Sequence, residues 1–242
     1  ESPLLQTEAD RRRAREVLSG FTFTEDLEEA ARATAPPFEI HLMPGARVVT
    51  RRNYGRSPVD DEFAEEQIRK WRLSGTIQPS TSPWASPLVV AHHPRTGKSR
   101  LCVDYRGLNA FTVPDSYLMP RIEDIQRALK GKKVFSKVDL SQGFNQYALS
   151  EKARPLTAFN GPRSGHFEFV GSPFGLRNLP SAFQRLMDTV LGTMGWARAC
   201  VYVDDVIVFS DSVADHHEHL RELADRFAAF NIQARASKCC FY

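Results

Sequence analysis

The sequence has few cysteines, and their spacing indicates neither a disulfide framework nor a zinc site. Four occur among its 242 residues, none of them in a CxxC pair: Cys102, Cys200, Cys239 and Cys240. The adjacent pair at the end suits neither a disulfide-stapled fold nor a zinc ribbon. Three of the four lie in or beside apolar runs, where a buried thiol is expected. We therefore expect reduced cysteines and a reducing compartment.

The sequence also lacks a membrane segment and a secretory signal. No apolar run approaches the roughly 18 residues that a membrane-spanning helix needs. The N-terminus, ESPLLQTEADRRRAR, has no apolar core of a signal peptide. We expect an intracellular protein, cytoplasmic or nuclear, with no membrane partner. Glu1 in place of methionine indicates a segment cut from a longer chain.

A large excess of one charge is absent as well. The formal net charge is +3 and the pI is about 8.7, which is compatible with nucleic acid but too small to indicate it alone. Hydrophobic residues make up 42% and charged residues 25%, the composition of an ordinary globular protein. The length allows one large domain or two lobes that share a core.

Hydrophobic periodicity and turn residues predict a mixture of helices and strands. Residues 1–37 read as a charge-rich arm, partly helical or disordered, that ends at two prolines. The predicted strands are 38–42, 87–91, 99–105, 134–140, 165–170 and the hairpin 199–210. The predicted helices are 61–75, 120–129, 181–194 with Ser181 as N-cap, and 216–231. This order favours an α+β fold with an antiparallel sheet.

Three carboxylates interrupt predicted strands that are otherwise apolar. Asp204 and Asp205 divide the run VYVDDVIVFS, and Asp139 lies near the end of VFSKVDL. Burying unpaired charge is costly, so these acids must lie at a turn, be paired, or bind a metal. A hairpin turn, where aspartate is common, explains the adjacent pair equally well. The second site shifts the balance: if the strands are neighbours, Asp139 and Asp204 face one point, as ligands of a hard cation such as Mg²⁺ do.

Nine motifs surround these acids along the chain. They are SGTIQPSTSPWASPLVV, RLCVDYRGLN, PRIEDI, FSKVDLSQGFNQ, TAF, GHFEF, PFGLRNLPSAFQRLM, YVDDVIVFS and SKCCF. In order and spacing they resemble the reverse transcriptases of gypsy-type LTR retrotransposons, and VYVDD resembles the YxDD box of that family. The match extends from about Phe38 to the end of the chain, and nine ordered motifs are far more specific than a lone YxDD box.

The resemblance implies a right-hand polymerase fold with RNA-directed DNA polymerase activity. Fingers, with the first palm elements, would span 38–129, and the palm would span 130–242, with the thumb absent. Asp139, Asp204 and Asp205 would bind two Mg²⁺ ions, with Mn²⁺ as a possible substitute, and Asp205 would be the least engaged. Such ions activate the primer 3′-hydroxyl and stabilise the leaving pyrophosphate.

The resemblance also implies roles around the incoming nucleotide. Phe144 matches an aromatic residue that excludes a 2′-hydroxyl, and an ordinary core aromatic is the alternative. Arg100 matches a fingers arginine that contacts the phosphates, and a solvated hairpin charge is the alternative. Lys238 matches a palm lysine that helps protonate pyrophosphate, or is a surface lysine. Further implied nucleotide contacts are Leu140, Ser141, Gln142, Gly143 and Phe174, and implied template or primer contacts are Gly175, Gln184 and Tyr202.

The sequence departs from the family pattern at two basic positions. The fingertip reads AHHPRTGKSR instead of a lysine-rich stretch, which leaves Arg95 and Lys98 as substitutes, and Leu156 replaces the lysine of KTAF. Both changes are expected to weaken phosphate contacts without touching the metal site. The implied partners are a primer on an RNA or DNA template, dNTPs, and the thumb, RNase H and integrase of the same polyprotein. A cytoplasmic virus-like particle or the nucleus is the implied location, and we expect this piece alone to bind primer–template poorly.

Two other functions fit parts of the sequence. A different two-metal enzyme, such as a nuclease, would use the three acids but gives Phe144 and Arg100 no role. A decayed copy that binds nucleic acid or serves as a scaffold fits the lost lysine, whereas the intact acids argue against it.

The histidine-rich motif DHHEHL is expected to be a solvated helix end. His216, His217 and His219 lack the i, i+4 spacing that places two histidines on one helical face for zinc.

Overall fold

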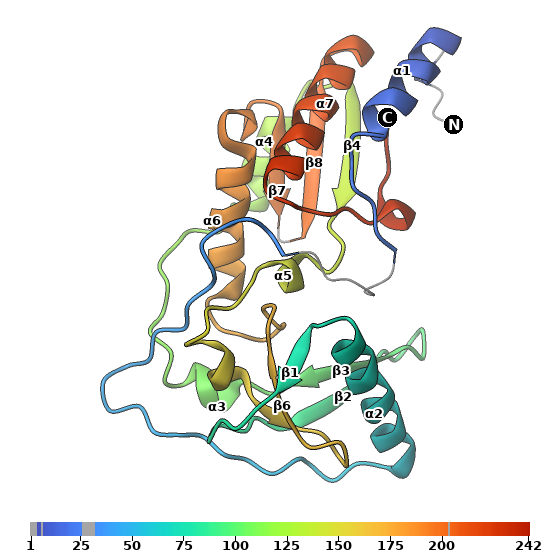
Figure 1. Cartoon of the computed structure of the whole chain (residues 1–242). Helices are drawn as coiled ribbons and strands as arrows, with labels where there is room; N and C mark the ends of the chain where they lie inside the picture. Colours follow the sequence, from blue (N-terminus) through green and yellow to red (C-terminus); the bar gives the residue numbers. More distant parts are fainter. Residues whose placement is uncertain (1–3, 6, 26–31, 203) are drawn as a thin grey trace.

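The computed structural model describes residues 4–5, 7–25, 32–202 and 204–242, and it shows a mixed helix and strand fold in two halves (Figure 1). Every pairing between the named strands is antiparallel, which confirms the predicted α+β class. Within the described part of the chain, no helix is long and apolar enough to cross a membrane.

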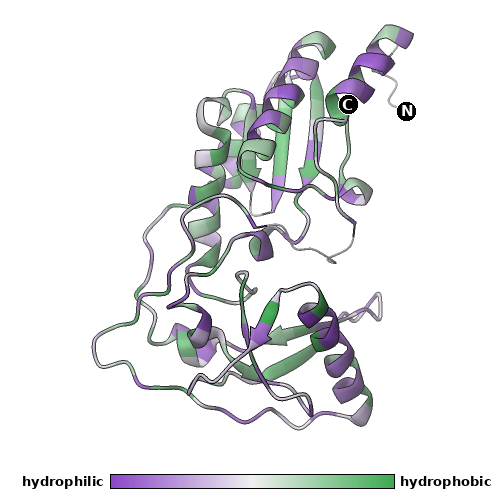
Figure 2. Cartoon of the chain, viewed as in Figure 1, coloured by the Kyte–Doolittle hydropathy of each residue, from purple (hydrophilic) through white to green (hydrophobic). Residues whose placement is uncertain are grey.

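The first half is a three-stranded sheet with helices on both faces. Its strands lie in the order β4 (Val134–Asp139), β8 (Asp205–Ser210) and β7 (Ala199–Tyr202). Helices α7 (Val213–Ala229) and α6 (Leu179–Leu191) pack against β8 and β7, and α4 (Ile122–Leu129) covers the opposite face. Buried and exposed residues alternate along β4, so one face of the strand belongs to the core. Hydrophobic strands run through both halves in Figure 2, whereas α2 is largely hydrophilic on the side in view.

The second half combines a hairpin, a small sheet and one long helix. The hairpin is β2 (Leu88–His92) with β3 (Ser99–Val103), and the sheet has the order β1 (Ile77–Pro79), β6 (His166–Phe169), β5 (Phe159–Asn160). Helix α2 (Pro58–Leu73) begins at a serine N-cap followed by proline, a combination that starts helices efficiently. Its Trp71 ring packs against Phe159 and Phe169, which fixes the helix on the sheet.

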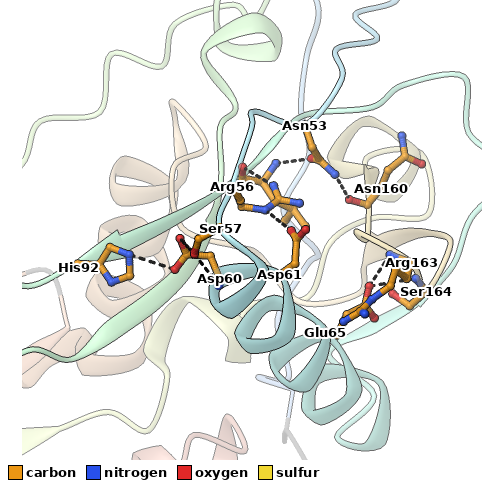
Figure 3. A network of polar contacts seen from close by, with 11 residues as sticks. Asn53, Arg56, Ser57, Asp60, Asp61, Glu65, His92, Asn160, Arg163 and Ser164 are labelled. Atoms are coloured by element: carbon orange, nitrogen blue, oxygen red, sulfur yellow. Dashed lines mark hydrogen bonds and ion pairs between the residues drawn. The ribbon is translucent and has the colours of Figure 1, made fainter.

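Polar contacts fasten the hairpin to the start of α2 (Figure 3). Arg56, whose side chain is nearly buried, pairs with Asp61 at 2.8 Å and donates to the Leu88 carbonyl at 3.2 Å. Asn53 accepts a hydrogen bond from the Leu88 amide at 2.8 Å, and His92 Nε2 lies 3.2 Å from Asp60 Oδ1. These contacts hold the hairpin, and with it the arginine at position 100, against the rest of the second half.

Shorter elements complete the chain. They are α1 (Glu8–Leu18), α3 (Arg106–Asn109), α5 (Gly143–Gln146) and the 3₁₀ turns η1 (Arg154–Thr157), η2 (Gly192–Met194) and η3 (Ala236–Lys238). Helix α1, within the predicted arm, starts with a capping box at Thr7 and packs on α7. Of the predicted arm, residues 1–3, 6 and 26–31 lie outside the described residues.

Two expected elements differ from the structure. Residues 38–42 make only isolated bridges, Phe38 with Leu149 and Leu42 with Thr112, so the predicted strand is wrong. The alternation of apolar and polar residues instead reflects side-chain packing, because Phe38 is buried whereas Glu39 and His41 are exposed. Helix α6 starts at Leu179 instead of after Ser181, because Pro180 is suited to the first helical turn.

The histidines of α7 correct a further expectation. His216 and His217 are buried, with 0% and 2% exposure, so the predicted solvated helix end is wrong. His216 bridges the sheet through hydrogen bonds of 2.7 Å to the hydroxyls of Ser136 and Ser210. Burial, with smaller contributions from the neighbouring histidines, lowers the pKa of His216 to about 4. Among the cysteines, which are all free, only Cys200 is buried, and Cys102 and Cys240 are exposed.

Candidate active site

The three predicted metal-binding acids meet at one end of the central sheet. The register of β4 and β8 places Asp139 directly opposite Asp205. The Leu140 amide donates to the Asp204 carbonyl at 3.4 Å, which continues the ladder past the last strand pair. The neighbouring strands expected from sequence are therefore present, and the turn after β7 carries Asp204 to the same point as Asp139.

A cleft of about 540 Å³ lies beside this end of the sheet, between the two halves of the molecule. It contains Asp139 and Asp204 on one side and residues 99–103 of β3 on the other. The predicted site residues that line it are Asp139, Asp204, Arg100, Leu140, Gln142, Gly143, Phe174 and Lys238. The predicted residues that lie outside its lining are Asp205, Ser141, Phe144, Gly175, Gln184 and Tyr202.

Asp204 is the most electrostatically strained of the three acids. Burial, with the negative charges of Asp139 and Asp205, raises its pKa to about 6. Its Oδ1 atom is buried, and no described group donates a hydrogen bond to it. A buried anionic oxygen without a donor is unfavourable unless a cation approaches it, so the residues present fit a divalent metal.

The other two acids each face a lysine. Asp205 Oδ2 lies 2.9 Å from Lys137 Nζ, and Asp139 Oδ1 lies 3.8 Å from Lys238 Nζ. In the described residues, no three acidic, histidine or cysteine side chains are grouped closely enough to hold a metal ion by themselves. A cation at Asp139 and Asp204 would therefore complete its shell with water and phosphate oxygens, as Mg²⁺ commonly does.

The loop after Asp139 runs close to the acids. The amides of Leu140 and Ser141 donate to the carbonyls of Asp204 and Gln233, so among the predicted nucleotide contacts of this loop these two amides are already engaged within the protein. Gln142 adopts the left-handed conformation, φ 47°, and starts the short helix α5. A β-carbon on Gly143 would lie 3.0 Å from Asp204 Oδ1, so the bare backbone there lets the acid approach the loop.

Phe144 lies behind the wall of the cleft. It is 5% exposed, and its ring centroid is 5.0 Å from that of Phe174 and 5.1 Å from that of Phe183. Phe174 itself lines the cleft and is 53% exposed. Phe144 is thus a packed aromatic one ring away from the cleft, and its predicted contact with a sugar stays a prediction.

The predicted template and primer contacts are scattered. Gln184 is 2% exposed and donates to Asp188 within α6, which favours a role in shaping the helix over a template contact. Gly175, at φ 95°, accepts a hydrogen bond from Asn109 at 2.8 Å, in the conformation that glycine adopts without strain. Tyr202 is 39% exposed at the end of β7.

Arg235 and Asn145 are among the cleft residues that the sequence prediction did not name. Arg235 lines the cleft, and its amide donates to the Asp139 carbonyl at 2.9 Å. Asn145 lines it as well, with a buried Oδ1 that accepts no hydrogen bond in the portion of the chain that the structure covers. The one available signal was their position, next to the SKCCF motif and directly after Phe144.

Comparisons with a family model and with individual proteins agree on one family. Residues 90–242 match the family described as reverse transcriptase (RNA-dependent DNA polymerase). An enzymatic polyprotein of Figwort mosaic virus is 40% identical over 185 residues, which cover 75% of this chain and 27% of the relative. A retrovirus-related Pol polyprotein from transposon 297 of Drosophila melanogaster is 36% identical over 181 residues, 73% of this chain and 17% of the relative. The chain thus spans about a quarter or less of these polyproteins.

Solved structures show the same fold. A foamy viral protease-reverse transcriptase, in complex with an RNA/DNA hybrid, aligns with a TM-score of 0.86 at 19% identity. The alignment covers 97% of this chain and 31% of the viral chain. The same kind of protein in complex with dsDNA aligns with a TM-score of 0.86 over 99% of this chain and 50% of that chain, at 20% identity.

Proposed function

The chain belongs to the reverse transcriptase family, and we propose that it is the fingers-and-palm segment of an RNA-directed DNA polymerase that extends a primer with dNTPs. The single observation that carries this proposal is the convergence of Asp139 and Asp204 on one cleft, opposite Arg100. The cleft thereby combines carboxylates suited to a divalent cation with a guanidinium suited to phosphate.

Within the family, we place the chain in a gypsy-type LTR retroelement. The ordered motifs and the similarity to the transposon 297 polyprotein support this assignment. Because the matched relatives are polyproteins several times longer, we expect thumb, RNase H and integrase parts to act with this segment in the cell. The free thiols agree with a location in the cytoplasm or nucleus.

The proposed chemistry divides the work between cation and protein. Two Mg²⁺ ions, or Mn²⁺ in their place, would supply Lewis-acid activation of the primer 3′-hydroxyl and charge neutralisation on the phosphates. Asp139 and Asp204 would hold the ions, and Asp205 would act less directly because Lys137 already pairs with it. Arg100 reaches into the cleft from the hairpin and would bind the triphosphate, while Lys238 would donate a proton to the departing pyrophosphate.

Primer extension on an RNA template in Mg²⁺ tests this function. We expect extension by the wild-type chain, stronger with its downstream thumb attached, and no measurable extension by Asp139→Asn or Asp204→Asn. Each of these variants removes one anionic ligand from a site that needs negative charge, whereas Asp205→Asn should lose less. Asp225→Asn, at an exposed position of α7, is the matched control and should retain full activity.

Two results would contradict the proposal. Extension by Asp204→Asn within tenfold of wild type would exclude the metal assignment. If the wild-type chain cleaves nucleic acid but extends no primer, and Asp139→Asn and Asp204→Asn lose this cleavage, the protein is instead a two-metal nuclease.

A further inference from the structure

The last segment of the chain lies between the N-terminal segment and β4. The Thr24 amide donates to the Ala234 carbonyl at 2.9 Å, and the Ala234 amide donates to the Thr22 carbonyl at 3.0 Å. On the other side, Ala234 forms an antiparallel bridge with Leu140, directly after Asp139. Figure 1 shows the N-terminal trace descending from α1 beside the C-terminal segment. Residues 22–25 are therefore fastened to the segment that borders the catalytic acids.

Glu25 makes the contacts that hold the turn η3. Its two carboxylate oxygens accept hydrogen bonds from the Ser237 amide at 2.7 Å and the Ser237 hydroxyl at 2.6 Å. Oε2 also lies 3.5 Å from Arg235 Nε. The hydrogen bonds from Ser237 lower the pKa of Glu25, so the carboxylate is anionic at neutral pH. One side chain thus contacts the start and the middle of the turn.

That turn carries two cations toward the acids. Arg235 lines the cleft, and Lys238 lines it with its Nζ 3.8 Å from Asp139 Oδ1. Both side chains are partly exposed, so their heads can meet a ligand. Two cations on a short turn beside paired carboxylates match the charge of a metal-bound polyphosphate.

We propose that Glu25 is a positioning residue that holds the 235–238 turn, so that Arg235 and Lys238 together bind the terminal phosphates of a nucleoside triphosphate and the pyrophosphate product. The proposal rests on the proposed polymerase function and adds to it a phosphate site built jointly by the N-terminal arm and the last turn. Arg235 supplies the guanidinium. Its backbone amide already donates to the Asp139 carbonyl, which places this residue beside the metal-binding acid.

Binding of inorganic pyrophosphate with Mg²⁺, measured by calorimetry, tests the site without catalysis. We expect Glu25→Ala to weaken binding about tenfold and Glu25→Gln, which keeps an acceptor for Ser237, to lose less. In primer extension the same variants should raise the KM for dNTP by a similar factor and should also lower kcat, because the displaced turn carries Lys238. Ser237→Ala removes only the hydroxyl contact and keeps the amide bond to Glu25, so it should lose less than Glu25→Ala, and the double variant should equal Glu25→Ala.

The matched control is Glu218→Gln. It removes the ion pair between Glu218 of α7 and Arg13 of α1, so it loosens the arm without touching the turn. Its pyrophosphate affinity should equal that of wild type. Unchanged pyrophosphate binding in Glu25→Ala, an equal loss in Glu218→Gln, or no binding by wild type would each overturn the inference. Pyrophosphate binding that depends on Glu25, in a chain that extends no primer, would instead contradict the proposed function and leave this anion site standing.

Discussion

At the scale of single residues, Gly143 determines how closely the loop after β4 approaches Asp204. A β-carbon there would lie 3.0 Å from Asp204 Oδ1 and 3.3 Å from the Phe183 ring. We expect Gly143→Ala to displace the acid and to lower primer extension more than tenfold, with the fold retained. Circular dichroism and extension rates measure the two effects. Gly55→Ala is the control, since a β-carbon there meets nothing within 4 Å, and equal activity of the two variants would exclude the crowding argument.

Phe144 poses a choice between sugar discrimination and packing. As a gate, it predicts that Phe144→Val admits ribonucleotides far more readily and raises the ratio of rNTP to dNTP incorporation. Its burial predicts, in addition, a loss of about 1–3 kcal/mol in the free energy of unfolding. Phe183→Val is the control, because Phe183 is also buried and its ring packs against that of Phe144. If both variants lose stability and neither changes the ratio, Phe144 is a packing residue.

The residue scale also shows what sequence can reveal of the site. Asp139 and Asp204 were predictable because charge inside an apolar run needs an explanation, and Arg100 because its motif is distinctive. Arg235 was not, since its place in the cleft depends on Ala234 lying between Thr24 and Leu140, contacts between segments far apart in the chain. The burial of Gln184 likewise depends on how α6 is rotated against the sheet, and the sequence alone does not give this rotation.

At the scale of elements, α7 is joined to the sheet through His216. The pKa of His216 is lowered to about 4 by burial, below its ordinary value of 6.5, so the unfolded chain binds more protons between these two values. The stabilising contribution of His216 is therefore complete above about pH 6.5 and is lost as the pH falls toward 4. The loss is on the order of 2–3 kcal/mol.

Urea unfolding of wild type and His216→Asn between pH 4 and 8 measures this contribution. The difference between the two proteins should shrink as the pH falls, because asparagine does not titrate. The comparison isolates His216 from Asp204, whose raised pKa contributes with the opposite sign below about pH 6. His93→Asn, at an exposed position of the fingertip, is the control; a pH-independent difference would exclude the protonation argument.

Helices and strands followed from sequence where local pattern and tertiary packing agree. The β2–β3 hairpin, β4, β8 and α2 have strong periodicity and clear turn or cap residues, and all of them are present. The segment 38–42 alternates like a strand but finds a partner at only two isolated positions, so its pattern reflects packing on the surface of other elements. The burial of His216 depends on two serines, one on β4 and one on β8, that no local pattern connects to α7.

At the scale of the whole molecule, both halves are built from separate stretches of the chain. The second half takes its long helix and its strands from residues 58–103 and 159–169, and α4, β4 and α5 are among the elements between these stretches. The first half takes β4 from the middle of the chain and β7 and β8 from its last quarter, and Leu140, directly after β4, bridges to Ala234. The strand that carries Asp139 is therefore inserted between two parts of the other half.

The bridge between Phe23 and Ala234 has a consequence for how the protein is made. On a ribosome, the nascent chain can assemble the hairpin and α2 early, since their partners are close in sequence. Strand β4 leaves the ribosome long before β8, its partner in the sheet, and residues 22–24 wait longer still for Ala234. The cleft that contains Asp139 and Asp204 therefore takes its final form only after Ala234 has been synthesised and has paired with Thr22, Thr24 and Leu140.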